Sequence, residues 1–125
     1  MRVLLDTHIL YWWFYDTKRL PRDAETLIRR AEEVFVSSVS VWEIAIKVRL
    51  GKMKARPQDI LSWIEKNDFL ELPITLRHAA AVADLPLHHE DPFDRLLVAQ
   101  AISEPLHLLT VDAQLKPYSE LVVVV

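Results

Sequence analysis

Residues 2–15 read RVLLDTHILYWWFY and combine two patterns that decide the fold. Arg2–Asp6 is a short apolar run, which is typical of a buried β-strand. Thr7–Tyr15 follows at once, with apolar residues around nearly all of its circumference, and this predicts a helix that is buried on more than one side. A strand that passes directly into a helix indicates an α/β protein if the alternation continues.

The rest of the chain continues this alternation of short apolar runs and helical segments. Further strands are predicted at Val34–Ser37, Phe69–Leu72, Leu106–Val111 and Leu121–Val125. Helices are predicted at Pro21–Glu33, Ser40–Leu50, Pro57–Asn67, Thr75–Leu85 and Asp91–Ser103, and Gly51 is expected to cap the second of these. Because the strands are apolar on both faces, we expect a three-layer α/β fold: a mostly parallel sheet flanked by helices. No linker or repeat interrupts the pattern, so residues 1–125 are expected to form one domain.

Composition excludes several classes of protein. The chain of 125 residues has one glycine, Gly51, which rules out the glycine-rich loops that bind dinucleotides and nucleoside triphosphates. It has no cysteine, which rules out disulfides and thiolate ligands. No apolar run is long enough for a membrane span, so we expect a cytoplasmic protein. The net charge of −3 means that an anionic substrate has to be attracted by a local basic patch or by metal ions.

Four acids fall where parallel strands end and the following helices begin. They are Asp6, Glu43, Asp94 and Asp112. Each of them could simply cap a helix: Ser40 and Glu43 have capping-box spacing, and Asp91 is expected to be an N-cap. Capping does not explain why both apolar strand termini carry an acid. Clustered carboxylates repel one another unless a cation neutralises them, and oxygen ligands suit Mg²⁺ or Mn²⁺.

The run His89–Ala101, HEDPFDRLLVAQA, resembles a signature of PIN-domain proteins of the VapC toxin type. Supporting matches occur in the same order at Leu5–Thr7, Ser40–Lys47, Leu50–Lys52 and Leu109–Asp112, and they cover essentially the whole chain. The resemblance implies a PIN-like fold and places the acidic positions of the family at Asp6, Glu43, Asp94 and Asp112. Asp6 and Asp94 are the expected direct metal ligands, while Glu43 and Asp112 complete the site directly or through water.

The activity implied by the resemblance is that of a Mg²⁺- or Mn²⁺-dependent endoribonuclease, acting as the toxin of a toxin–antitoxin pair. The implied partners are RNA, a cognate antitoxin and a second copy of the chain in a homodimer. A receiver-like phospho-acceptor domain and a non-catalytic RNA- or protein-binding PIN module are the alternatives. The receiver reading lacks the paired acids after the first strand and the lysine after the last central strand.

Basic and aromatic residues predict where macromolecules bind. The candidates for contact with RNA phosphates are Lys47, Arg49, Lys52, Lys54, Arg56 and Arg95. The first five lie in a stretch without an acid that begins directly after Glu43. Thr7 and Thr110 could bond metal ligands or phosphate oxygens. The aromatic run 11–15 cannot face one core on a helix, so part of it is expected to meet a protein partner.

The histidines predict no metal site. His88 and His89 are adjacent and should point in different directions, which makes a zinc site there unattractive. His78 and His107 are expected to be ordinary residues at or near the surface.

Overall fold

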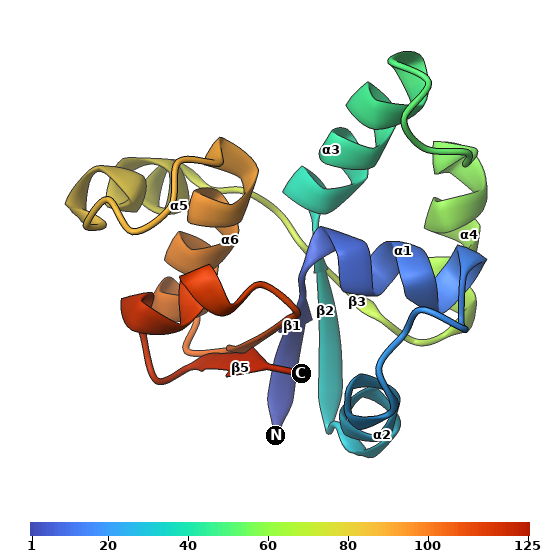
Figure 1. The fold of residues 1–125 in the computed structure, drawn as a ribbon, viewed down its shortest axis with the longest axis horizontal. Coiled ribbons are helices and arrows are strands. Elements are labelled where there is room, and N and C mark those ends of the chain that lie inside the picture. Colours follow the sequence, from blue (N-terminus) through green and yellow to red (C-terminus); the bar gives the residue numbers. More distant parts are fainter.

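The computed structural model describes residues 1–125 and is built on a sheet of five parallel strands. The strand order is β3-β2-β1-β4-β5 (Figure 1), so the first strand lies at the centre. The strands are β1 (Arg2–Leu5), β2 (Glu33–Ser37), β3 (Leu70–Leu72), β4 (His107–Thr110) and β5 (Val122–Val124). The helices are α1 (Thr7–Tyr15), α2 (Arg22–Arg30), α3 (Ser38–Arg49), α4 (Pro57–Lys66), α5 (Leu76–Ala81) and α6 (Pro92–Ser103), with 3-10 helices η1 (Val82–Asp84) and η2 (Ala113–Tyr118).

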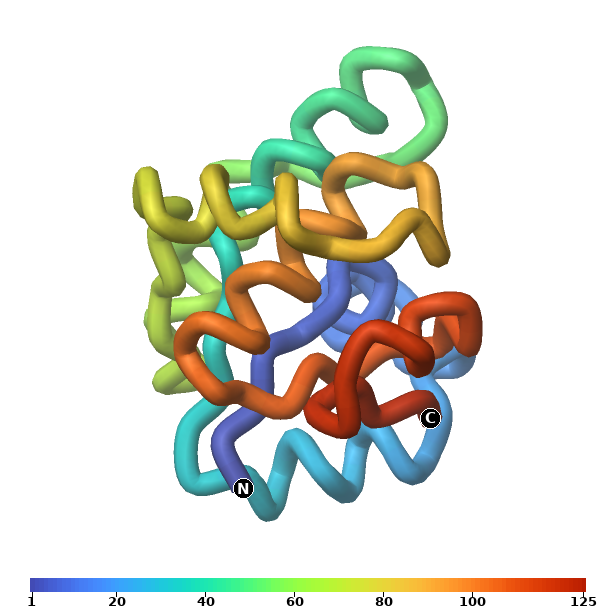
Figure 2. The backbone as a smooth tube through the Cα atoms, turned by 90° about the vertical axis from the view of Figure 1, so that its left-hand side faces the viewer, coloured from blue at the N-terminus to red at the C-terminus, as the bar shows by residue number.

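Helices cover both faces of the sheet, as the apolar strands require. Successive residues of a strand point to opposite faces, so Val3 and Leu5 enter one core while Leu4 enters the other. Ile9 of α1, Ile28 of α2 and Ile60 of α4 fill the first core. Leu97 and Val98 of α6 belong to the second, together with Leu115 of η2. Figure 2 shows α5 and α6 in front of the central strands, which confirms the predicted three layers.

The predicted elements are present, with shifted boundaries. The helix expected to start at Ser40 begins two residues earlier, because the Ser37 side chain at the end of β2 accepts a hydrogen bond from the Val39 amide and caps it. The alternative role of Ser40 and Glu43 as a capping box therefore does not apply, and Glu43 lies in the second turn of α3. Residues 75–85 form α5 and η1 rather than one helix.

One further boundary differs from the prediction, and one element is additional. The helix expected over Pro21–Glu33 ends at Arg30, since Glu33 already pairs with Arg2 in the sheet. The 3-10 helix η2 was not predicted; the Asp112 side chain caps it by accepting from the Gln114 amide. None of the helices combines the length and the apolar character that crossing a bilayer requires.

Candidate metal centre

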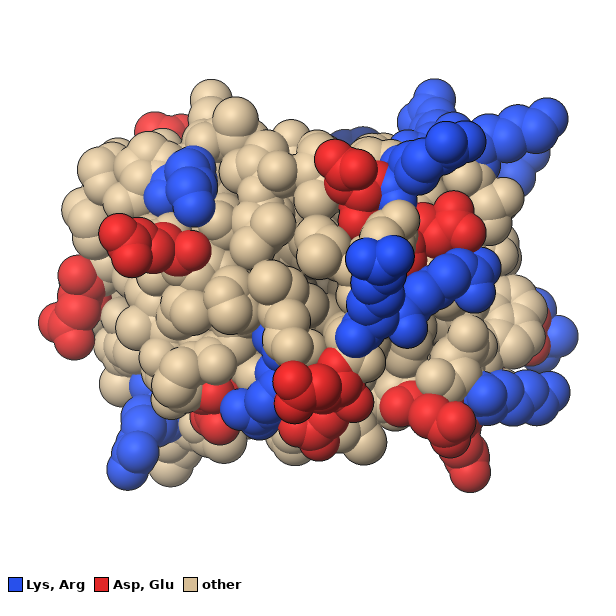
Figure 3. Space-filling view, turned by 90° about the horizontal axis from the view of Figure 1, so that it is seen from below, with Lys and Arg blue, Asp and Glu red and all other residues tan.

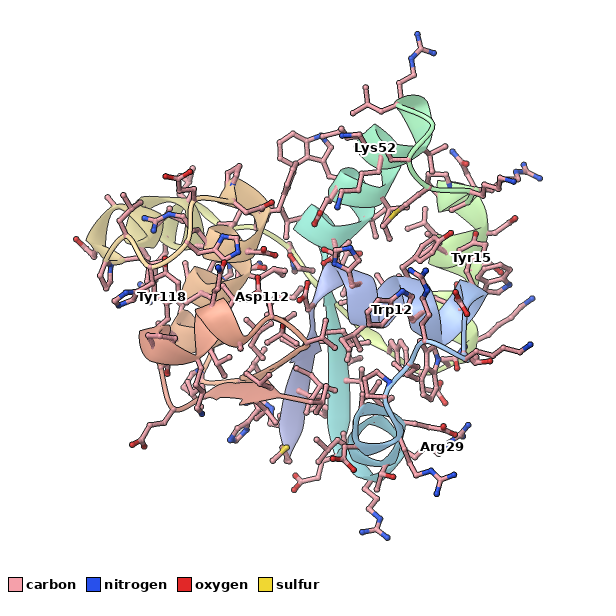
Figure 4. The ribbon with its side chains drawn as sticks, viewed as in Figure 1. Trp12, Tyr15, Arg29, Lys52, Asp112 and Tyr118 are labelled. Carbon is pink, nitrogen blue, oxygen red and sulfur yellow. The ribbon has the colours of Figure 1, made fainter.

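The carboxyl ends of β1 and β4 lie next to the N-terminal turns of α3 and α6 at one edge of the sheet. Asp6 directly follows β1 and is the first residue before α1, while Asp94 lies in the first turn of α6. Asp112 follows β4 beyond Val111, and its label in Figure 4 lies level with the upper end of β1. Glu43 approaches from the second turn of α3. The fold thus brings together all four acids predicted from the sequence.

Asp6 is almost fully buried in this cluster, with 3% of its surface exposed. The Thr110 hydroxyl donates a hydrogen bond to its Oδ2, while its buried Oδ1 has no hydrogen-bond partner. Burial raises the pKa of Asp6 above its usual range, and the neighbouring charge of Glu43 raises it further; the Thr110 bond and the positive charge of His8 offset part of this rise. A cation next to Oδ1 would stabilise the charged form of this carboxyl.

Glu43 repeats this arrangement on α3. Its side chain is 4% exposed, and Lys47, one turn further along the helix, donates to its Oε2 at 2.7 Å. The other oxygen, Oε1, is buried and has no partner. Below it, the Thr7 hydroxyl donates to Ser40 Oγ at 3.0 Å and ties the start of α1 to α3. Thr110 therefore orients the Asp6 carboxylate, and Thr7 fixes the position of α1 relative to the helix that carries Glu43.

Asp94 also lies among like charges. Burial raises its pKa to about 8, and the charges of Asp6, Asp91, Glu43 and Asp112 all act in the same direction. Asp91 is the N-cap of α6: its Oδ1 accepts from the amides of Phe93 and Asp94. Asp91 thus orients the first turn that carries Asp94, which agrees with the predicted capping role.

His89 is a member of the site that the sequence reasoning missed. The Asp91 amide donates to its Nδ1 at 3.0 Å, so the ring proton lies on Nε2, which donates to Asp112 Oδ2 at 2.8 Å. The same Nε2 lies 3.6 Å from Asp94 Oδ2. The signal was present in the sequence, because His89 is the first residue of the run that resembles the PIN signature.

The donor set fits a hard divalent cation. Two of the three buried side-chain atoms that lack a hydrogen-bond partner, Asp6 Oδ1 and Glu43 Oε1, belong to this cluster. Buried polar atoms are normally paired, so two unpaired carboxylate oxygens at one site indicate an absent positive partner. Carboxylate oxygens from well-separated segments are the ligands that Mg²⁺ and Mn²⁺ favour. In addition, His89, Asp94 and Asp112 place ligand atoms within 4.8 Å of one another.

The predicted basic residues separate into two groups. Lys47 is paired with Glu43, whereas Arg49, Lys52, Lys54 and Arg56 are exposed around the end of α3 and the segment that follows it. Figure 3 views the opposite end of the molecule, below the first strand, where positive and negative side chains are intermingled on one half of the surface. The stretch after α3 is different because it contains no acid between Ile44 and Gln58.

Arg95 does not extend into solvent as a phosphate ligand would. Its guanidinium donates to the carbonyl oxygens of Pro86, His89, Val82 and Leu85 and to the Tyr118 hydroxyl. The Tyr118 hydroxyl in turn accepts from the His89 amide at 2.9 Å. Arg95 therefore holds the segment that carries His89 against η2, and this position does not favour the predicted contact with RNA.

His78 also departs from its prediction. It is 1% exposed rather than at the surface. Its Nδ1 accepts from the Thr75 amide, and its Nε2 lies 2.6 Å from Glu104 Oε2, which joins the start of α5 to the end of α6. The capping-box position of this histidine, three residues after Thr75, was the signal in the sequence.

Comparisons with known proteins agree with this fold. The PIN domain family matches residues 3–121, and the chain belongs to that family. It is 34% identical over 120 residues to Ribonuclease VapC22 of Mycobacterium tuberculosis, covering 93% of this chain and 91% of the relative.

Solved structures of lower sequence identity share the fold. In the complex of VapBC2 from Rickettsia felis with a promoter DNA fragment, a chain superposes with a TM-score of 0.72 at 18% identity, over 100% of this chain and 98% of the other. A chain of a toxin–antitoxin complex from Klebsiella pneumoniae gives a TM-score of 0.68 at 18% identity, over 97% and 95% of the two chains. The predicted PIN-like fold is thereby confirmed.

Proposed function

We propose that the protein is a divalent-metal-dependent endoribonuclease that acts as the toxin of a toxin–antitoxin pair in the cytoplasm. The observation that carries the proposal is the pair of buried carboxylate oxygens without partners, Asp6 Oδ1 and Glu43 Oε1, in a chain of the PIN family. The ribonuclease activity in the name of the 34% identical relative supports the same assignment.

In this proposal Asp6 and Asp94 bind Mg²⁺ or Mn²⁺ directly, and Glu43 and Asp112 complete the site directly or through water. A bound divalent ion supplies an activated water and neutralises charge on the scissile phosphate. Thr110 fixes the orientation of the Asp6 carboxylate, and Lys47 fixes that of Glu43. His89 holds Asp112 by donating to Oδ2. The products expected are 5′-phosphate and 3′-hydroxyl ends, since water rather than the RNA 2′-hydroxyl is the nucleophile and the 3′-oxygen is the leaving group.

The proposed partner is an antitoxin that covers the aromatic first helix. A hollow of about 430 Å³ between α1, α2 and α4 is lined by Trp13, Phe14 and Trp63, with Glu25 and Arg29 at its border. An amphipathic segment of the antitoxin would pack there and extend an arginine toward Asp6 and Asp94, because a guanidinium matches carboxylates in a bidentate manner. The toxin–antitoxin complexes among the structural neighbours support a partner of this kind, and we expect the toxin to form a homodimer.

The proposal is tested with the purified protein on a panel of single-stranded and structured RNAs, with EDTA, Mg²⁺ or Mn²⁺. Cleavage that requires the metal and leaves 5′-phosphate ends supports it. Asp6→Asn and Asp94→Asn proteins should lose cleavage while keeping the circular dichroism of the native chain. Metal-independent cleavage, or 2′,3′-cyclic phosphate ends, would contradict the assignment, and binding without any cleavage would favour the non-catalytic PIN module.

The antitoxin is tested with the product of the adjacent gene. Removing its carboxyl-terminal segment, or changing the arginines of that segment to alanine, should restore ribonuclease activity. Full inhibition by the shortened partner would contradict the proposed contact with Asp6 and Asp94. Light scattering of the free toxin and of the complex measures the expected dimer.

A further inference from the structure

A second hollow, of about 390 Å³, lies on the other side of α1 from the aromatic residues that face α2 and α4. Its aromatic wall is formed by Tyr11 and Trp12 of α1, and its basic wall by Lys52 and Lys54 of the segment after α3. In Figure 4 the labelled Trp12 lies on α1, and Lys52 follows the end of α3 above it. We call this hollow the α1 groove.

The shape of the α1 groove depends on a sharp turn at Gly51. This residue has φ = 73°, a left-handed conformation that favours glycine. The Lys52 amide donates to the Lys47 carbonyl and the Gly51 amide to the Val48 carbonyl, so α3 ends in a Schellman motif. The chain therefore reverses at this point, and residues 52–54 lie against α1 instead of continuing the line of α3.

Two tyrosines then fasten the reversed segment to α1. The Tyr11 hydroxyl donates to the Lys54 carbonyl at 3.0 Å, and the Tyr15 hydroxyl accepts from the Arg56 amide at 3.2 Å. The two tyrosine rings also stack on each other at 5.0 Å. These bonds occupy the backbone of the basic segment and leave its lysine side chains exposed. The α1 groove is thus a fixed feature of the fold.

The charge of the groove is opposite to that of the whole protein. Lys52 and Lys54 form no ion pair with an acid, and Arg19, the third basic residue of the groove, faces only Asp16 at 3.6 Å. The chain as a whole carries a net charge of −3. The unpaired lysines favour an anionic ligand. The half-exposed indole of Trp12 beside them favours a ligand with flat aromatic rings.

The groove lies near the acidic site, because His8 lines it. The exposed His8 lines the groove, lies two residues from Asp6 and acts electrostatically on it. Its ring is 5.7 Å from that of Trp12, at a tilt of 45°. Asp6, His8 and Trp12 therefore form a path from the proposed metal ligands to the two lysines.

We propose that the α1 groove binds single-stranded RNA next to the scissile phosphate, with one base stacked on Trp12 and the flanking phosphates held by Lys52 and Lys54. This inference rests on the proposed ribonuclease function and adds a substrate site to it. Single-stranded nucleic acids are bound by this combination of a cationic groove and an aromatic platform. A duplex keeps its bases stacked inside, so Trp12 cannot reach them, and the groove selects an unpaired segment.

The test measures binding of a fluorescein-labelled RNA oligomer by anisotropy in EDTA, where no metal-dependent cleavage occurs. Trp12→Ala should weaken binding by about 5- to 150-fold, the range for loss of one base–aromatic stack, and Trp12→Phe should restore most of it. Lys52→Ala/Lys54→Ala should lower the log–log salt slope by about 1.4, at about 0.7 per lost phosphate contact with a single strand. A duplex of the same sequence should bind more weakly and show no dependence on Trp12.

The matched control is Arg30→Ala/Lys66→Ala, which removes the same charge from two exposed residues outside the groove. Its slope should stay that of the native protein. An unchanged slope for Lys52→Ala/Lys54→Ala, or a Trp12→Phe protein as weak as Trp12→Ala, would overturn the proposal. The proposal would also be overturned if the binding of oligoglutamate depended on both lysines and the binding of RNA did not. In that case the groove would accept an acidic protein segment.

Because this assay needs no metal, its failure is separate from failure of the proposed function. If RNA binding depends on Trp12 but no metal-dependent cleavage is found, the groove stands and the nuclease assignment falls. If cleavage requires metal and Asp6 but RNA binding ignores Trp12 and both lysines, the groove falls and the nuclease assignment stands.

Discussion

The two halves of the acidic site differ in what their oxygens contact. Asp6 and Glu43 are almost fully buried, and each has one oxygen bonded by a fixed neighbour and one oxygen with no partner. Asp94 and Asp112 are more open, with 18% and 31% of their side chains exposed. Both oxygens of Asp112 accept hydrogen bonds, from His89 and from the Gln114 amide.

This difference predicts different tasks for the two pairs. A buried, unpaired carboxylate oxygen is costly, so the inner pair depends most strongly on a cation. The outer pair reaches solvent, where a substrate phosphate would approach, and its geometry depends on His89. The inner pair, together with the direct ligand Asp94, should therefore set whether a cation is bound, and Asp112 should set how well the bound cation is used.

The largest expected effect comes from the inner pair. Asp6→Asn should reduce RNA cleavage to background, because it removes a ligand charge while keeping the shape of the side chain. Asp112→Asn should retain measurable activity, reduced by about 10- to 100-fold as for the partners that orient a metal site. Initial cleavage rates on a labelled RNA at saturating Mg²⁺ measure both changes.

Isothermal titration with Mn²⁺ separates the two explanations for a loss of activity. Asp6→Asn should remove measurable binding, and Asp112→Asn should weaken it. Equal losses of activity and of Mn²⁺ affinity in the two proteins would remove the distinction between inner and outer pairs.

The next effect concerns His89 and the outer pair alone. His89→Ala should lower the cleavage rate by about 10- to 100-fold, because Asp112 loses the donor that fixes its Oδ2. His88→Ala is the matched control: this neighbouring ring packs on Tyr118 at 5.0 Å and bonds none of the four acids. Equal rates for the two histidine variants would show that Asp112 needs no positioning by His89.

A smaller effect is expected on stability without metal. Burial and the neighbouring carboxylates raise the pKa of Asp94 to about 8. The folded state then binds a proton more tightly than the unfolded chain, so the contribution of Asp94 is complete at low pH and is lost as pH rises through about 8. In EDTA, the melting temperature of the native protein should therefore fall between pH 5 and pH 8.

Asp94→Asn removes the part of this dependence that comes from Asp94, so the variant should melt several degrees above the native protein at pH 8 and by a smaller margin at pH 5. Asp23→Asn, at an exposed position of α2, is the control and should change neither value. Thermal melts followed by circular dichroism measure the melting temperatures of the native and variant proteins at both pH values. A native protein that melts higher at pH 8 than at pH 5, or an Asp94→Asn protein no more stable than the native one at pH 8, would contradict the expected charge repulsion.

Much of the architecture could be predicted from local patterns, because buried strands and capped helices leave signals within a few residues. The strand at residues 2–5 and the acid that follows it could be read directly from RVLLD. The start of α3 could not, since Ser37, Ser38 and Ser40 are all possible caps and tertiary contacts select among them: Ser38 Oγ accepts from the Ile74 amide, and Ser40 from Thr7.

The roles of single residues in the site were harder to predict than its location. The four acids were found because strand ends converge at one edge of a parallel sheet. The position of His89 depends on the turn before α6, where Arg95 and Tyr118 bond six backbone groups, and no local pattern encodes that network. The aromatic run 11–15 was expected to lie partly in the core and partly against a protein partner, but its detailed division by α1 between the core, the basic segment and the two hollows was not predicted.

The smallest expected effect concerns Lys47, which shares Glu43 of the inner pair with the proposed cation. Lys47 Nζ holds Oε2 at 2.7 Å and leaves Oε1 free. Lys47→Met keeps the length of the side chain and removes its charge, so the attraction between the site and a cation should increase. The Mg²⁺ concentration that gives half-maximal cleavage should fall by a few-fold, since a charge interaction at a partly exposed site is worth about 1 kcal/mol, which is about a fivefold change in affinity. Arg49→Met, which removes an exposed charge from the same helix, should leave this concentration unchanged. A higher Mg²⁺ requirement in Lys47→Met would mean that the lysine mainly holds Glu43 in place, and the inner pair would then need positioning as much as the outer pair does.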